Sequence, residues 1–160
     1  MIELDDALAG VTHLGVDTAP IIYFVEADPR YDAVVSEVFR WIDTGVFKGK
    51  TSVISLLELL VLPMRLGNHH LQNEYRDRLL TSDHFQTLAL SADVAVRAAD
   101  LRARYSLRTP DGLQIASALS AGYEGFLTND SALRRVTELS VLILGELELS
   151  RRCASVGEGR

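Results

Sequence analysis

Four acidic residues recur at one kind of position along this chain, at or just inside the start of a predicted helix. Three of them lie close behind a short apolar segment that predicts a buried strand. In a parallel sheet, strand ends and helix starts gather at one edge, where ligands bind. Carboxylates crowded there repel one another unless a cation joins them, and hard divalent ions such as magnesium prefer oxygen ligands. The candidates for such a metal-dependent site are Asp17, Glu58, Asp111 and Asp130.

Each of these acids also has a purely structural explanation, because the first turn of a helix favours acids and hydroxyl groups. Ser55 and Glu58 fit a capping box, and Asp130 has the position to cap the segment that follows it. Glu58 also lies within the apolar residues 56–61, and Asp111 opens a nearly uncharged helix. A lone charge in such surroundings is expensive to bury, so we expect these two acids to have a partner.

Length and composition fit one globular domain with a hydrophobic core. The chain has 160 residues, of which 48% are hydrophobic, and no apolar segment reaches the roughly 18 residues of a membrane span. The N-terminus is acidic where a secretory signal is basic, so a cytoplasmic location is expected. Cys153 is the only cysteine, which excludes an internal disulfide and a multi-cysteine zinc site.

The formal net charge of −6 argues against a protein that grips nucleic acid over a broad basic surface. The basic residues are unevenly placed, however, because four arginines fall in one stretch just before Asp111. This stretch predicts either a solvated helix face or a local basic rim that holds a phosphodiester beside the acidic centre. The four are Arg97, Arg102, Arg104 and Arg108.

Strands and helices alternate along the chain, which indicates an α/β fold with a mainly parallel central sheet of four or five strands flanked by helices. We expect one domain over residues 14–146, a short extension over residues 1–13, and a flexible tail over residues 147–160. The expected strands are residues 14–17, 49–52, 85–90, 125–128 and 139–144. Helices are expected to start near Pro20, Ser91 and Thr109 and to cover residues 31–44, 53–66, 69–80 and 131–136.

Several other catalytic classes lack their motifs in this sequence. It contains no glycine loop that cradles phosphate, no Gly-x-Ser-x-Gly elbow and no histidine spacing typical of zinc sites. A receiver-like domain needs a lysine late in the sheet, and none follows Lys50. An aspartyl-phosphate phosphatase needs a second acid where Ala19 stands. The aromatic side chains, Tyr23 among them, are expected in the core.

In its motifs the chain resembles PIN-domain proteins, and specifically the VapC-type toxins of bacterial toxin–antitoxin pairs. The resemblance covers residues 14–144, and the Pro-Asp and Thr-Asn-Asp segments are its most specific parts in this order and spacing. One departure is Gly112, where a small residue such as alanine is usual. The matching segments are Val16-Asp17-Thr18, Thr51-Ser52 leading to Glu58-Leu59, residues 109–119, and residues 126–130 followed by residues 141–144.

The resemblance implies a Mg²⁺- or Mn²⁺-dependent endoribonuclease that hydrolyses RNA phosphodiesters, the toxin of a type II toxin–antitoxin pair. It also implies a homodimer and a cognate antitoxin protein as partners. A PIN-fold module that binds RNA or protein without catalysis is the alternative, and transfer, ribosomal and messenger RNA are all open as substrates. By matching motifs, the metal-holding quartet is Asp17, Glu58, Asp111 and Asp130, and Thr128 is the hydroxyl residue near the last acid.

Overall fold

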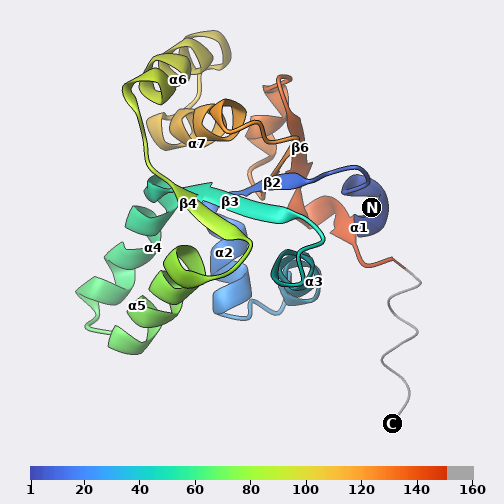
Figure 1. Ribbon diagram of the computed structural model, residues 1–160, viewed down its shortest axis with the longest axis vertical. Coiled ribbons are helices and arrows are strands. Elements are labelled where there is room, and N and C mark those ends of the chain that lie inside the picture. The colour runs from blue at the N-terminus through green and yellow to red at the C-terminus, as the bar shows by residue number, and fades with distance from the viewer. Residues whose placement is uncertain (151–160) are drawn as a thin grey trace.

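Five parallel strands in the order β4-β3-β2-β5-β6 form the central sheet of the computed structural model, which describes residues 1–150 (Figure 1). The strand order reverses between β2 and β5, so the carboxyl ends of these two strands flank the topological switch point where ligands bind in such sheets. The strands are β2 (His13–Val16), β3 (Lys48–Ser52), β4 (Phe85–Leu88), β5 (Gly125–Thr128) and β6 (Ser140–Ile143).

Helices cover both faces of this sheet, and each face has its own core (Figure 1). One core is built on α2 (Thr18–Val25), α3 (Asp32–Asp43), α4 (Val53–Arg65) and α5 (His69–Arg76). The other core is built on α6 (Ala92–Tyr105), α7 (Thr109–Ser120) and the 3₁₀ segment η2 (Ser131–Arg135). The predicted α/β class with a five-stranded parallel sheet flanked by helices is confirmed. None of the helices in the described residues has the length and apolar character of a membrane span.

A second, two-stranded parallel sheet joins the two ends of the described chain. In it β1 (Ile2–Glu3) pairs with β7 (Leu147–Glu148), and α1 (Leu4–Ala7) and η3 (Leu144–Glu146) adjoin these strands. Leu4 and Leu147 are both buried in the first core. The segments on either side of the expected domain therefore pack onto it. The rest of the expected tail, with Cys153, lies outside the described residues.

Helix ends differ from the predictions at a few places. The helix expected over residues 69–80 gives way after Arg76 to the π-helical segment η1 (Asp77–Thr81). Here Arg78 turns inward, with its guanidinium carbon 4.8 Å from the ring centre of Phe39 and a hydrogen-bonded ion pair to Asp43. These partners lie far away in the sequence, so helical periodicity does not reveal them.

The predicted capping box at α4 is wrong, because the N-cap of this helix is Ser52. The Ser52 hydroxyl accepts the N–H of Ile54 at 3.2 Å, whereas Ser55 is fully buried. The helix expected near Thr109 begins there as α7, with Arg108 at the N-cap position and no side-chain cap. Asp17 caps α2 as expected, since its side chain accepts the N–H of Thr18.

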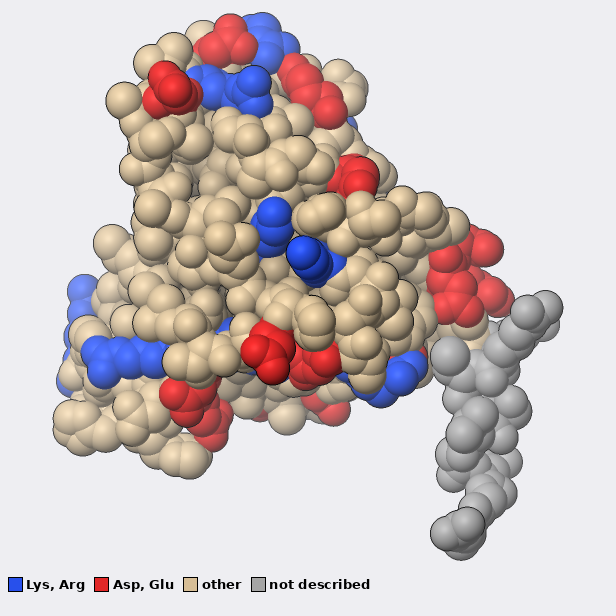
Figure 2. Space-filling model, viewed as in Figure 1, with Lys and Arg blue, Asp and Glu red and all other residues tan. Residues whose placement is uncertain are grey.

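Charged side chains of both signs are interspersed on the face of the molecule that Figure 2 shows, and that face has no broad basic surface. This distribution agrees with the net charge of −6. The face in view therefore offers no broad basic surface of the kind that binds the phosphate backbone of nucleic acid.

Gly15 allows the strand that leads to Asp17 to pack closely against aromatic rings. A Cβ atom at this position would lie 2.6 Å from Tyr123 Cδ2 and 2.8 Å from Phe126 Cδ2. Both side chains are buried, so neither ring has free space into which to withdraw.

We therefore expect Gly15→Ala to lower the free energy of unfolding by about 1–3 kcal/mol through overpacking, as measured by urea denaturation. Gly125→Ala on the neighbouring strand is the matched control, because its nearest contact would be 3.3 Å from Leu14 Cδ1. A loss at Gly15 no larger than the loss at Gly125 would contradict this packing argument.

Candidate functional site

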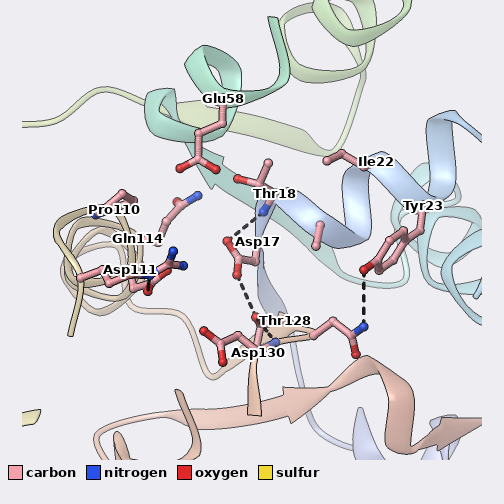
Figure 3. A pocket seen from close by; sticks show the side chains of 13 residues that line it. Asp17, Thr18, Ile22, Tyr23, Glu58, Pro110, Asp111, Gln114, Thr128 and Asp130 are labelled. Atoms are coloured by element: carbon pink, nitrogen blue, oxygen red, sulfur yellow. Dashed lines mark hydrogen bonds and ion pairs between the residues drawn. The ribbon is translucent and has the colours of Figure 1, made fainter. Parts of the chain in front are cut away.

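A cleft of about 470 Å³ lies at the switch point of the sheet, and all four predicted acids line it together with Thr128 (Figure 3). Asp17 follows β2, and Asp130 follows β5 by two residues. Glu58 reaches the cleft from the second turn of α4, and Asp111 from the first turn of α7. Residues up to 113 positions apart in the chain, from Asp17 to Asp130, are thus brought to one edge of the sheet.

Asp17 holds the most constrained carboxylate of the cleft. Its Oδ1 accepts the N–H of Thr18 at 2.8 Å, and its Oδ2 accepts the hydroxyl of Thr128 at 2.8 Å. Burial raises the pKa of the Asp17 carboxyl, these two hydrogen bonds lower it in part, and the negative charges of Asp111 and Glu58 raise it further. No basic side chain of the described residues forms an ion pair with Asp17. Its negative charge is therefore held in place without a counter-charge.

Thr128 connects two of the acids at the end of β5. This side chain is fully buried, and its Oγ1 donates to Asp17 and accepts the N–H of Asp130 at 3.1 Å. Asp130 in turn caps η2, because its Oδ1 accepts the N–H of Ala132 at 2.9 Å. The capping role expected of Asp130 is thus present, while the same side chain lines the cleft.

The two remaining acids differ in their partners. Glu58 is exposed and forms no hydrogen bond or ion pair with the described residues, although its charge acts on Asp17 and Arg108. The sequence argument that apolar neighbours would bury Glu58 is therefore wrong, since Leu57 beside it is 62% exposed. Asp111 accepts the Nε–H of Arg108 at 3.0 Å. Only one acid of the four is thus paired with an arginine among the described residues.

A buried network of hydroxyl and amide groups lies beneath the acids. The Ser55 hydroxyl accepts the hydroxyl of Thr51 at 2.9 Å and the side-chain amide of Gln114 at 2.6 Å. Because its two lone pairs are then used, its own proton goes to Thr18 Oγ1, 2.8 Å away. Ser52 completes the network by donating to Gln114 Oε1 at 2.7 Å.

Each of three network residues is a close sequence neighbour of a cleft acid. Thr18 follows Asp17 directly, while Ser55 and Gln114 lie three positions from Glu58 and Asp111 on the same helices. A buried network of this kind is stiff, because its hydrogen bonds fix both distance and direction. It therefore fixes α2, α4 and α7 relative to one another, and with them the backbone positions of these acids.

The structure revises the predicted basic rim to a single arginine, because only Arg108 of the four lines the cleft. Arg97 contacts Ser120 instead, and Arg102 donates to the carbonyl of Leu107. Arg104 forms ion pairs with two acids that do not line the cleft, Asp100 on α6 and Glu138 between η2 and β6.

Three further residues of the cleft were missed or misassigned from the sequence. Tyr23 was expected in the core, but it lines the cleft and its hydroxyl accepts the side-chain amide of Asn129 at 3.5 Å. Asn129 and Gln114 line the cleft as well. The only sequence signals for this location are that Asn129 is next to Asp130 and that Gln114 lies one helical turn after Asp111.

The donor chemistry of the cleft fits a hard divalent cation, since every candidate ligand is an oxygen atom. Within residues 1–150, no three His, Cys, Asp or Glu side chains are gathered closely enough to hold a metal ion as they stand. Magnesium usually keeps several water ligands and takes only one or two carboxylates directly. The acids of this cleft are therefore compatible with a metal site that is completed by water.

Comparison with known proteins gives one family match and several similar structures. The family model of the PIN domain matches residues 15–139. No sequence among curated proteins matches this chain. Among solved structures, 22 chains match its fold.

Three of these structures illustrate the similarity. A toxin–antitoxin complex from Klebsiella pneumoniae has a TM-score of 0.64 and 19% identity, covering 82% of this chain and 97% of that chain. VapBC2 from Rickettsia felis, bound to a DNA fragment from its promoter, has a TM-score of 0.66 and 15% identity, covering 82% and 98%. FitAB bound to a DNA fragment has a TM-score of 0.67 and 20% identity, covering 84% and 97%. At such identities the likeness concerns the fold alone.

The uncompensated charge of Asp17 predicts that Asp17→Asn raises the free energy of unfolding of chelator-treated protein at neutral pH. The folded-state pKa of Asp17 is raised, so the wild type loses stability as pH rises from the unfolded value of about 3.9 through the folded value. Asparagine has no such loss; its Oδ1 can accept the N–H of Thr18, and its Nδ2 would donate to Thr128 Oγ1 in place of accepting from it. The gain should therefore be present at neutral pH and absent at acidic pH, as measured by urea denaturation.

Asp111→Asn is the matched control for this prediction, because the Asp111 carboxylate already has Arg108 as a partner. It should give no comparable gain in stability at neutral pH. An Asp17→Asn protein that is less stable than the wild type at neutral pH would show that its charge is compensated after all.

Proposed function

This chain belongs to the PIN-domain family, and we propose that it is a Mg²⁺- or Mn²⁺-dependent endoribonuclease that hydrolyses phosphodiesters of cytoplasmic RNA. The observation that carries the proposal is the fixed carboxylate of Asp17, which has no ion-pair partner among the described residues and lines one cleft with Glu58 and Asp111, whose charges act on it. Such an arrangement costs stability, and a divalent cation would offset that cost. The charge pattern therefore favours a cation-dependent activity over a purely structural role for these acids.

In the proposed mechanism, Asp17 and Asp111 are the residues that would hold the metal ion. When bound, the ion lowers the pKa of water and offsets the charge that develops on the phosphate. Asp17 cannot turn away, because Thr18 and Thr128 fix both of its oxygens. The N–H of Asp130 donates to Thr128 Oγ1, and this hydrogen bond fixes the end of β5 next to Asp17. The wide cleft leaves room for one phosphodiester beside these groups.

Glu58 has a different proposed role, as the residue that orients the attacking water. Its side chain is exposed and has no hydrogen-bonding partner among the described residues, so its oxygens can accept a hydrogen bond from a water molecule. Its helix is nevertheless fixed by Ser55 one turn earlier. Glu58 thus has a fixed backbone and a carboxylate without a hydrogen-bonding partner among the described residues.

We also propose that the protein is the toxin of a toxin–antitoxin pair and that its antitoxin docks on α4. One similar structure is described as a toxin–antitoxin complex. On α4 the apolar side chains of Leu57, Val61 and Met64 share one helix face and are 62%, 40% and 49% exposed. A row of this kind, exposed on a monomer, is typical of a protein–protein contact.

The position of this apolar row favours an antitoxin segment as its occupant. Glu58 lies on the same helix and lines the cleft, so a segment on α4 reaches the acids directly. Their negative charge suits a basic side chain of such a segment. The predicted homodimer is the other occupant that this surface can take, and the two are separated by experiment below.

We expect Asp17→Asn and Asp111→Asn each to lower the rate of Mg²⁺-dependent RNA cleavage at least about a hundredfold, because each removes a charged oxygen from the reacting region. The assay compares cleavage of total RNA with added magnesium and with a chelator. Asp93→Asn, the same change at the start of α6, serves as the control and should keep full activity. Full activity of both cleft variants would reject the nuclease, and a wild type without magnesium-dependent cleavage would favour the non-catalytic binding module.

For the docking surface, we expect Leu57→Asp to abolish co-purification with the product of the reading frame directly upstream, since a charge would be buried in an apolar contact. Val96→Asp is the matched control, because Val96 is 72% exposed on α6 and does not line the cleft. Light scattering on the chain alone tests the other occupant. A dimer that Leu57→Asp converts to monomers, with co-purification unchanged, would assign the α4 row to a second copy and contradict the antitoxin proposal.

A further inference from the structure

Arg108 is the only basic residue among the described residues that line the acidic cleft. Its Nε donates to Asp111 Oδ2 at 3.0 Å. The Arg108 side chain is 77% exposed, whereas that of Asp111 is 13% exposed. The guanidinium therefore lies on the solvent-exposed side of the carboxylate.

The backbone at Arg108 is firmly held although its side chain is exposed. Its carbonyl accepts the N–H of Gly112 at 2.9 Å, and the preceding carbonyl of Leu107 accepts the Nε–H of Arg102 at 2.9 Å. Gly112 makes room for this anchor, because a Cβ atom there would lie 2.7 Å from Arg102 Cγ. The glycine that departs from the usual family pattern thus has a packing reason, and it helps to place Arg108 beside the cleft.

The charge of Arg108 acts on three acids that come from three different elements. Its pKa is raised first by the hydrogen bond and charge of Asp111 and then by the charges of Asp130 and Glu58. The ion pair itself has a single hydrogen bond and an exposed cation. Exposed pairs of this kind contribute little to stability, so the contact is easily exchanged for a stronger one.

We propose that Arg108 is a built-in counter-cation of the cleft, which neutralises Asp111 in the metal-free protein and yields that carboxylate to a divalent ion. The inference rests on the proposed function, because it requires that an ion binds among these acids. In this arrangement, Arg108 competes with that ion for the Asp111 carboxylate. Its removal should strengthen metal binding, whereas the loss of a residue that merely supports the site would weaken it.

The experiment is a calorimetric titration of Mn²⁺ into the chelator-treated full-length chain, for the wild type and for Arg108→Gln. The variant should bind Mn²⁺ more tightly by up to about fivefold, which corresponds to the free energy of one exposed ion pair. The difference should shrink as salt is added, because the ion pair is screened. Arg97→Gln removes the same charge outside the cleft and should bind Mn²⁺ as the wild type does.

Arg108→Lys keeps the charge, so its Mn²⁺ affinity should stay near that of the wild type. An unchanged or lower affinity of Arg108→Gln, or equal gains in the glutamine and lysine variants, would overturn the counter-cation role. If the wild type binds Mn²⁺ and only these comparisons fail, the proposed function stands without this inference. If the wild type binds no Mn²⁺ at all, the proposed function fails and this inference fails with it.

Discussion

The carboxylate of Asp17 lies at the end of a central strand, although burial and the charges of neighbouring acids both disfavour its ionised form. Two fixed donors offset part of this cost, and one of them, the N–H of Thr18, belongs to the start of α2, where the helix dipole favours negative charge. The other donor, Thr128, comes from the adjacent strand β5. The position of Asp17 is thus set by the one place in the sheet where the strand order reverses.

The buried network around Ser55 explains why polar side chains occur beneath the cleft, where an apolar core would be the simpler solution. Each of its hydroxyl and amide heteroatoms has at least one hydrogen-bond partner within the network, which offsets the cost of burying them. Apolar packing is tolerant of small shifts, whereas hydrogen bonds fix distance and direction. Such bonds join α2, α4 and α7, so the backbone positions of the acids on or next to these helices are fixed. The network side chains themselves do not neutralise the carboxylates.

Local sequence signals were sufficient for most of the fold and for the convergence of the acids. Short apolar segments alternating with helical patterns predicted the sheet, and the residues after the apolar strands predicted Asp17 and Asp130. Contacts between distant residues gave no such signal: Ser52 and Gln114 are 62 positions apart, and β1 and β7 are too short to show a period. Glu58 was misjudged for a related reason, since the apolar residues around it resemble a core segment although Leu57 is exposed. A surface that binds a partner and a surface that faces the core have the same composition in sequence.

In the proposed function, a net charge of −6 and one arginine among the described residues of the cleft would limit how RNA binds. Electrostatic affinity for nucleic acid grows with the number of phosphates that basic side chains neutralise, and one arginine neutralises few. An acidic protein with this cleft repels a phosphodiester until cations offset its carboxylates. In the proposed function the ion therefore has two effects, since it permits the substrate to approach and also activates water. Substrate binding and catalysis would then depend on the same acids, which is why the charge at Asp17 has to be kept free of a permanent partner.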